Sequence, residues 1–192
     1  KKFYRHLEQL LRPIDGSSGA EEMLRMITRR LVESYNEDYG IESGRLYVEH
    51  KNHFTLIESI GEFGNTIAGK TVSRSYPVIR ELERSRLVRI TPDSPGFDPE
   101  LEAQFTHLNY AAILVGSAPA YIVSLGIRHT GSEDELMLVL ESIRTLIGLK
   151  LRQAELEGQL RQARTIQLSL LPRRLRQLEG FELAAATYPA DE

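Results

Sequence analysis

Apolar residues recur every three or four positions in stretches near both ends of the chain, a spacing typical of amphipathic helices. One stripe covers residues 20–36, and Ser18 and Glu21 have capping-box spacing at its start. From Ser132 to Pro172 nothing interrupts a second helix of about forty residues, far longer than an average globular helix. A shorter stripe over residues 2–12 predicts a short first helix.

The middle of the chain has a different pattern. Short apolar runs separated by turn residues predict strands, and prolines in favourable first-turn positions predict two short helices. The predicted strands cover residues 46–48, 54–57, 87–90, 110–115 and 121–127, and the short helices cover residues 76–85 and begin at residue 98.

This order of elements resembles that of a GAF domain, the small-molecule sensor module of signalling proteins, over residues 19–150. The best local matches are Ser43–Tyr47 at the first strand and the last two strands leading into the long helix. The resemblance implies an α+β fold: an antiparallel sheet flanked by helices, with a short N-terminal helix and a long C-terminal coiled-coil helix. It also implies a ligand pocket between the sheet and residues 61–109. Core packing is the competing interpretation for the candidate pocket walls, which are Tyr47, Phe54, Ile113 and Tyr121.

Composition excludes several functions. The 192 residues carry a formal net charge of −3, which argues against a nucleic-acid partner. The absence of cysteine excludes disulfides, thiolate metal sites and thioether-linked chromophores. No apolar run approaches the roughly 20 residues that cross a bilayer, so no membrane partner is expected. We therefore expect a cytoplasmic location.

The second half of the long helix carries a seven-residue repeat. Apolar side chains at this spacing form a narrow seam that is buried by pairing with another helix, and glutamines within it weaken the pairing. We expect a parallel homodimer here, whereas Leu136, Leu140, Ile143 and Ile147 are expected to pack on the sheet. The alternative is that the whole helix packs on its own domain. The predicted seam contains Leu149, Gln153, Leu156, Leu160, Ala163, Gln167 and Leu170.

Three segments near the C-terminus, residues 166–172, 180–185 and 188–190, read IQLSLLP, GFELAA and YPA. In succession they resemble the lead-in to the RsbU/SpoIIE-like PPM-type serine/threonine phosphatases. The resemblance implies a downstream phosphatase domain in cis that binds Mn²⁺ or Mg²⁺, and possible control by a regulatory protein. The metal-binding aspartates of that family would follow Asp191 and Glu192, so no catalytic residue, metal ligand or cofactor is assigned within these residues. The predicted divisions are residues 1–17, 18–150, 151–172 and 173–192.

Two other functions remain open. Residues 64–71, GNTIAGKT, match the phosphate-loop pattern of nucleotide hydrolases, although no helical stripe follows Thr71. The second alternative is an interaction module that dimerises without a ligand. Glu49, His50 and His53 flank a predicted hairpin turn, where solvated side chains are expected rather than a metal site.

Overall fold

A computed structural model describes residues 19–128 and 133–170 and, ahead of them, residues 5, 7–9, 12 and 14. Most of the predicted first helix lies outside these residues, and so do Ser18 and Ser132, at the predicted starts of the two long helices. So does the segment after Leu170, which contains most of the phosphatase-like lead-in. Those predictions stay predictions.

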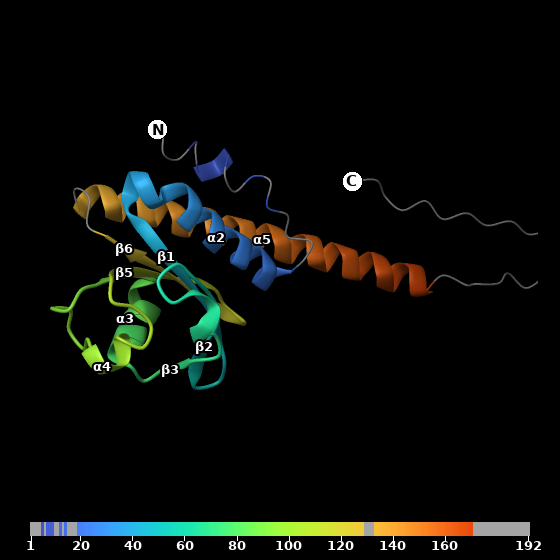
Figure 1. The fold of residues 1–192 in the computed structure, drawn as a ribbon. Coiled ribbons are helices and arrows are strands. Elements are labelled where there is room, and N and C mark those ends of the chain that lie inside the picture. Colours follow the sequence, from blue (N-terminus) through green and yellow to red (C-terminus); the bar gives the residue numbers. More distant parts are fainter. Residues whose placement is uncertain are drawn as a thin grey trace, which may run out of the picture.

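Six antiparallel strands form one sheet in the order β3-β2-β1-β6-β5-β4. The two long helices, α2 and α5, lie together on one face, and the short helices α3 and α4 lie on the other (Figure 1). The α+β architecture predicted from the sequence is confirmed. The strands are β1 Ile41–Glu49, β2 His53–Ile60, β3 Thr71–Ser73, β4 Leu87–Ile90, β5 Asn109–Gly116 and β6 Ala120–Ile127; the helices are α2 Ala20–Tyr39, η1 Gly64–Ile67 (3₁₀), α3 Pro77–Ser85, α4 Pro99–Glu102 and α5 Glu133–Leu170.

The covering helices begin where their sequence signals predict. Pro77 occupies the first turn of α3, where its missing amide costs no hydrogen bond. The Asp98 carboxylate accepts hydrogen bonds from the amides of Glu100 at 3.0 Å and Leu101 at 3.1 Å, and so caps α4. Strand β3 was not predicted, because three residues at a sheet edge carry too little periodicity to detect.

Helix α2 rests directly on strand β1. A β-carbon on Gly44 would lie 2.7 Å from Cγ2 of Thr28 and 2.8 Å from Cγ2 of Val32, so only glycine permits this approach. The apolar stripe of α2 is buried against the sheet, with Met23, Leu24 and Ile27 fully enclosed. The two elements are therefore in direct, close-packed contact.

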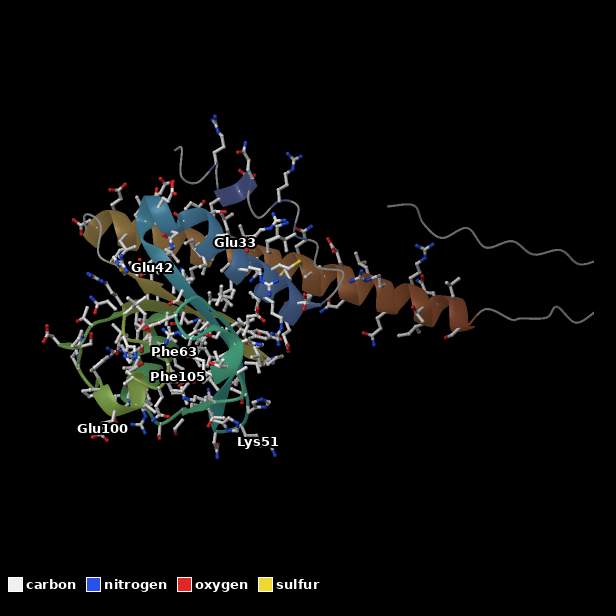
Figure 2. All side chains as sticks on the ribbon, in the orientation of Figure 1. Glu33, Glu42, Lys51, Phe63, Glu100 and Phe105 are labelled. Atoms are coloured by element: carbon white, nitrogen blue, oxygen red, sulfur yellow. The ribbon has the colours of Figure 1, made fainter. Side chains whose placement is uncertain are left out.

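Helix α5 packs beside α2 through a stripe of its first half. As predicted, Leu140, Ile143 and Ile147 are buried and Leu136 is partly buried in the core that α5 shares with the sheet, and the stripe continues through Leu151 and Ala154. The helix is 38 residues long without a break, close to the predicted length. Beyond Ala154 it extends away from the domain (Figures 1 and 2).

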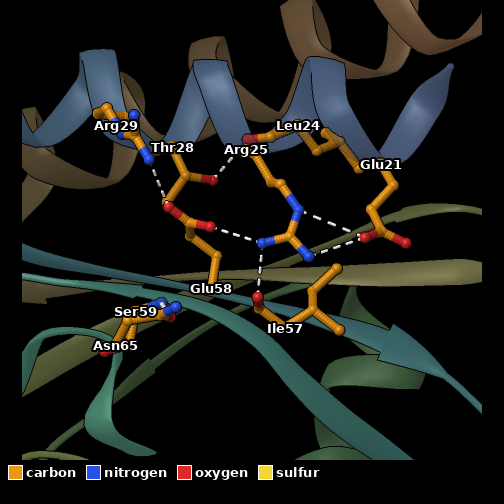
Figure 3. A network of polar contacts seen from close by, with 9 residues as sticks. All are labelled: Glu21, Leu24, Arg25, Thr28, Arg29, Ile57, Glu58, Ser59 and Asn65. Carbon is orange, nitrogen blue, oxygen red and sulfur yellow. Dashed lines mark hydrogen bonds and ion pairs between the residues drawn. The ribbon is translucent and has the colours of Figure 1, made fainter. Parts of the chain in front are cut away.

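A charged network joins α2 to β2 on this face (Figure 3). The Glu58 carboxylate accepts hydrogen bonds from Arg25 at 2.5 Å and from Arg29 at 2.8 Å, and Arg25 also donates to Glu21 and to the Ile57 carbonyl. Burial by itself would raise the pKa of Glu58, but the hydrogen bonds from Arg29 and Arg25 outweigh it and lower that pKa. The folded state therefore favours the charged carboxylate.

Replacing Glu58 by glutamine is expected to lower the free energy of unfolding by about 1–2 kcal/mol at neutral pH. A carboxyl group with a lowered pKa stabilises the fold above its unfolded-state pKa, and this stabilisation disappears as the pH falls through the lowered value. The difference between Glu58→Gln and wild type should therefore shrink below pH ~4.5. Urea denaturation at neutral and acidic pH measures it, with the exposed Glu37→Gln as control. A pH-independent difference would contradict the electrostatic origin.

Candidate ligand cavity

A cavity lies between the sheet and the segments that cover it, on the face away from α2 and α5. Its volume is about 30 Å³, which is room for one or two water-sized groups. Strands β1, β2, β3, β5 and β6 form its floor, and α3, α4 and the segment after α4 form its cover. Most of the lining is apolar, and it includes Val78, Leu82, Leu101, Phe105 and Ile122.

Two of the four predicted wall residues line this cavity. They are Tyr47 on β1 and Phe54 on β2, whose side chains point away from the long helices. Ile113 and Tyr121 do not, which corrects the predicted position of both. Successive side chains of a strand alternate between faces, and these two belong to the cluster packed against α2 and α5.

The cavity contains a buried arginine that the sequence reasoning missed. Arg45 lies on β1, directly opposite Ser124 of β6, and is only 2% exposed. Its Nη2 donates to the Ser124 hydroxyl at 2.8 Å, and its guanidinium carbon lies 4.9 Å from the centre of the Tyr110 ring. Its Nε is buried without a hydrogen-bond partner. Arg45 forms no ion pair with any residue that the structure describes.

Opposite this cation, the covering segment contributes one buried acid. Glu102 at the end of α4 accepts hydrogen bonds at Oε1 from the hydroxyls of Tyr110, at 2.7 Å, and Tyr76, at 2.8 Å. Burial, reinforced by the Glu102 charge, raises the pKa of both phenols well above the usual value, so both remain hydrogen-bond donors. The Tyr76 hydroxyl also accepts from the Asp98 amide at 3.1 Å, which ties α3 to α4. These bonds hold the cover onto the sheet.

A signal for the two buried charges was present in the sequence. Arg45 stands between the small residues Ser43 and Gly44 and the apolar run that begins at Leu46, and Glu102 follows the capped start of a very short helix. An arginine inside a strand with both faces buried has to face either a residue that pairs with its charge or a binding site. The sequence did not indicate which residue faces it, because Ser124 and Tyr110 come from strands distant in sequence.

The phosphate-loop pattern does not adopt the geometry of a phosphate loop. Residues 64–67 form the 3₁₀ helix η1, and Thr71 begins strand β3 instead of a helix. Lys70 donates to the carbonyl of Gln104 at 3.1 Å and lies 5.8 Å from the Phe105 ring centre. The helix N-terminus that would hold phosphate in such a loop is therefore missing here.

No metal site is evident in the described part of the chain, since no three potential ligands gather there. Glu49 is already engaged by Arg74, at 2.8 Å, and by the Ala120 amide, at 2.9 Å. His50 and His53 lie side by side at the β1–β2 turn, with ring centres 5.1 Å apart. None of the described helices has an apolar stretch long enough to cross a membrane.

The predicted seam of α5 faces solvent. The side chains of Leu149, Leu156 and Leu160 are 56%, 54% and 70% exposed, and those of Gln153, Ala163 and Gln167 are also exposed. Leu149 is two residues beyond the buried Ile147, which places it about 200° around the helix. The seam and the buried stripe therefore occupy opposite sides of α5. Leu170 ends the helix, and its side chain is outside the description.

Neither protein-family profiles nor curated protein sequences match the chain. Solved structures do match. They include the GAF domain of a phosphoenolpyruvate-protein phosphotransferase from Coxiella burnetii, with TM-score 0.57, 16% identity and coverage of 82% of this chain and 95% of that one. Free methionine-R-sulfoxide reductase from Neisseria meningitidis, in complex with its substrate, matches with TM-score 0.61 and 14% identity, over 82% of this chain and 94% of that one. The phycocyanobilin-bound GAF domain of a cyanobacterial phytochrome matches with TM-score 0.55 and 18% identity, over 79% of this chain and 96% of that one. This chain thus has the fold of a GAF domain.

Proposed function

We propose that this chain is the sensor region of a signalling protein, in which a small molecule in the cavity changes the arrangement of a dimeric helix α5. The observation that carries the proposal is α5 itself. One unbroken helix is part of the sensor core through one side and presents an exposed heptad seam on the other. Such a helix can transmit a change in the position of the sensor core to a domain that follows it in the chain.

Two features support ligand binding. The cavity encloses a buried arginine that lacks a full set of partners, within an otherwise apolar lining. Two proteins with this fold, the methionine-R-sulfoxide reductase and the phytochrome domain, are described with a small molecule bound. The interaction module without a ligand is the second candidate, favoured by the small volume of the cavity.

The output that we propose is a PPM-type serine phosphatase domain following α5 in cis. Its support is the resemblance of residues 166–190 to the lead-in of those enzymes. Parallel pairing of two α5 helices would bring two such domains together at the same end of the dimer. The phosphatase part is tested by assaying the parent protein for release of phosphate from phosphoserine proteins with Mn²⁺ or Mg²⁺. Metal-independent activity, or none, would count against it.

Native mass spectrometry of this chain tests the sensor proposal. The expected result is a dimer that carries an additional small-molecule mass, which is lost on denaturation. The dimer reports on α5, and the additional mass reports on the cavity. A monomer without added mass, which also gains none from a cell extract of small molecules, would overturn the proposal. A dimer that never acquires a ligand would favour the interaction module.

A further inference from the structure

The buried guanidinium of Arg45 is the least compensated charge of the cavity. It is 2% exposed, its Nη2 donates to the neutral Ser124 hydroxyl, and its Nε has no hydrogen-bond partner. Its other close neighbours are Tyr110, which offers its ring face, and the phenol of Tyr47. A charge removed from water needs an opposite charge or a full set of hydrogen bonds. The described neighbours provide neither.

The acid in the same cavity does not fill this role. Glu102 forms no ion pair with Arg45, and its Oε1 already accepts two tyrosine hydroxyls. Tyr110 connects the two charged residues, with its ring beside the guanidinium and its hydroxyl on the carboxylate. The cavity thus keeps its cation available while its acid is occupied in holding the cover.

We infer that the cavity binds a small monocarboxylate with an apolar body, whose carboxylate pairs with Arg45 and accepts a hydrogen bond from the unpartnered Nε. This inference rests on the proposed sensor function and names its ligand class. Arginine presents its N–H groups as a planar fork that matches a carboxylate. The apolar residues around it, including Phe54, Leu101 and Phe105, fit a hydrocarbon or aromatic body.

Charge and size narrow the ligand further. Among the lining residues Arg45 is the one cation and Glu102 already places one negative charge nearby, so a monocarboxylate adds less repulsion than a phosphate monoester, which carries about 1.5–2 charges. At about 30 Å³ the cavity holds little more than the head group. A larger body has to displace the cover, α3 and α4, which Glu102 ties to Tyr76 and Tyr110. Binding of such a ligand would therefore change the position of the cover.

The test is calorimetric titration of the whole chain with acetate, isovalerate and phenylacetate, and with the amide of each. At least one acid with an apolar body should bind, and at least about 10-fold more tightly than its amide, because the amide lacks the charge that Arg45 requires. Phenyl phosphate should bind more weakly than phenylacetate. This comparison needs only the wild-type protein, so it does not depend on how a variant folds.

Arg45→Met is the variant to compare, with Arg80→Met on the exposed side of α3 as control. Arg45→Met should lose at least about 10-fold in affinity for the acid, and Arg80→Met should not. Without ligand, the Tm of Arg45→Met should equal or exceed that of wild type, because an uncompensated buried charge is removed. If Arg45 served only to stabilise the fold, its replacement by methionine would instead lower the Tm.

Several outcomes would overturn the inference, and they separate it from the function on which it rests. One such outcome is that amides and acids bind equally tightly, both to wild type and to Arg45→Met. The cavity is then a ligand site and the sensor proposal stands, but the inference that the ligand is a carboxylate is refuted. Tighter binding of phenyl phosphate than of phenylacetate also refutes the carboxylate. If neither acids nor amides bind and the native protein carries no added mass, both proposals fail.

Discussion

Replacing Gly61 by alanine is expected to lower the free energy of unfolding by about 4 kcal/mol, near the upper end of single substitutions. Gly61 follows β2 with φ +88°, a backbone conformation that costs residues with a β-carbon about 1–2 kcal/mol. An added β-carbon would also lie 2.4 Å from the carbonyl oxygen of Glu42 and 2.9 Å from the Cα of Ser43. These are atoms of β1, so relief of the clash requires the central strand to move.

The matched control for this variant is Gly69→Ala. Gly69 has nearly the same φ, +89°, but an added β-carbon would have nothing within 4 Å. Gly69→Ala should therefore lower the free energy of unfolding by only the cost of the positive φ, about 1–2 kcal/mol. Chemical denaturation of both variants measures the difference. Equal losses would show that the contact with β1 does not constrain the fold.

The second large effect is expected at the α5 seam. Leu160→Glu should weaken the proposed dimer at least about 100-fold, because burial of a leucine contributes about 1.5–3 kcal/mol in each helix and a buried carboxylate adds a penalty. The monomer should keep its stability, since the Leu160 side chain is 70% exposed on a single chain. Analytical ultracentrifugation over a range of concentrations measures the dissociation constant, and thermal denaturation measures the stability of the domain.

Gln162→Glu is the control for the seam. It introduces the same acid two residues further along, on an exposed position about 200° from Leu160. This variant should leave the dissociation constant within about twofold of wild type, since a single exposed charge contributes little. If both variants dissociate equally, general charge repulsion and not the seam controls association. A wild-type chain that is already monomeric would refute the dimer.

Much of the fold was predictable because its boundaries carry local chemical signals. The starts of α3 and α4 follow from Pro77 and Asp98, and the length of α5 follows from the absence of any interruption before Pro172. Strands β5 and β6 follow from apolar runs around a turn. Strand β3 was missed because its pairing with β2 depends on contacts distant in sequence.

The cavity was predictable in place but not in detail. In β5 and β6 nearly every residue is buried, so the alternation of apolar and polar residues that tells one face from the other is missing. Ile113 and Tyr121 were therefore assigned to the wrong face. In β2, which contains Phe54, buried and partly buried residues alternate along most of the strand. The hydrogen bonds of Arg45 to Ser124 and of Tyr76 to Glu102 join residues 79 and 26 positions apart, so periodicity could not indicate them.

Consecutive residues of strand β1 face opposite sides of the sheet. Arg45 lines the cavity, while Gly44 and Leu46, its two neighbours, face α2 and the core around it. The sheet thus separates the face of the cavity, where we propose a ligand, from the face of the long helices, where we propose the output. A shift of β1 that accommodates a carboxylate would press on α2 at Gly44, where there is no spare room, and α2 lies against α5. Because α5 is continuous, a rotation of its first half would turn the outward leucines by the same angle. A ligand would then act on the proposed dimer by changing which residues of α5 face each other.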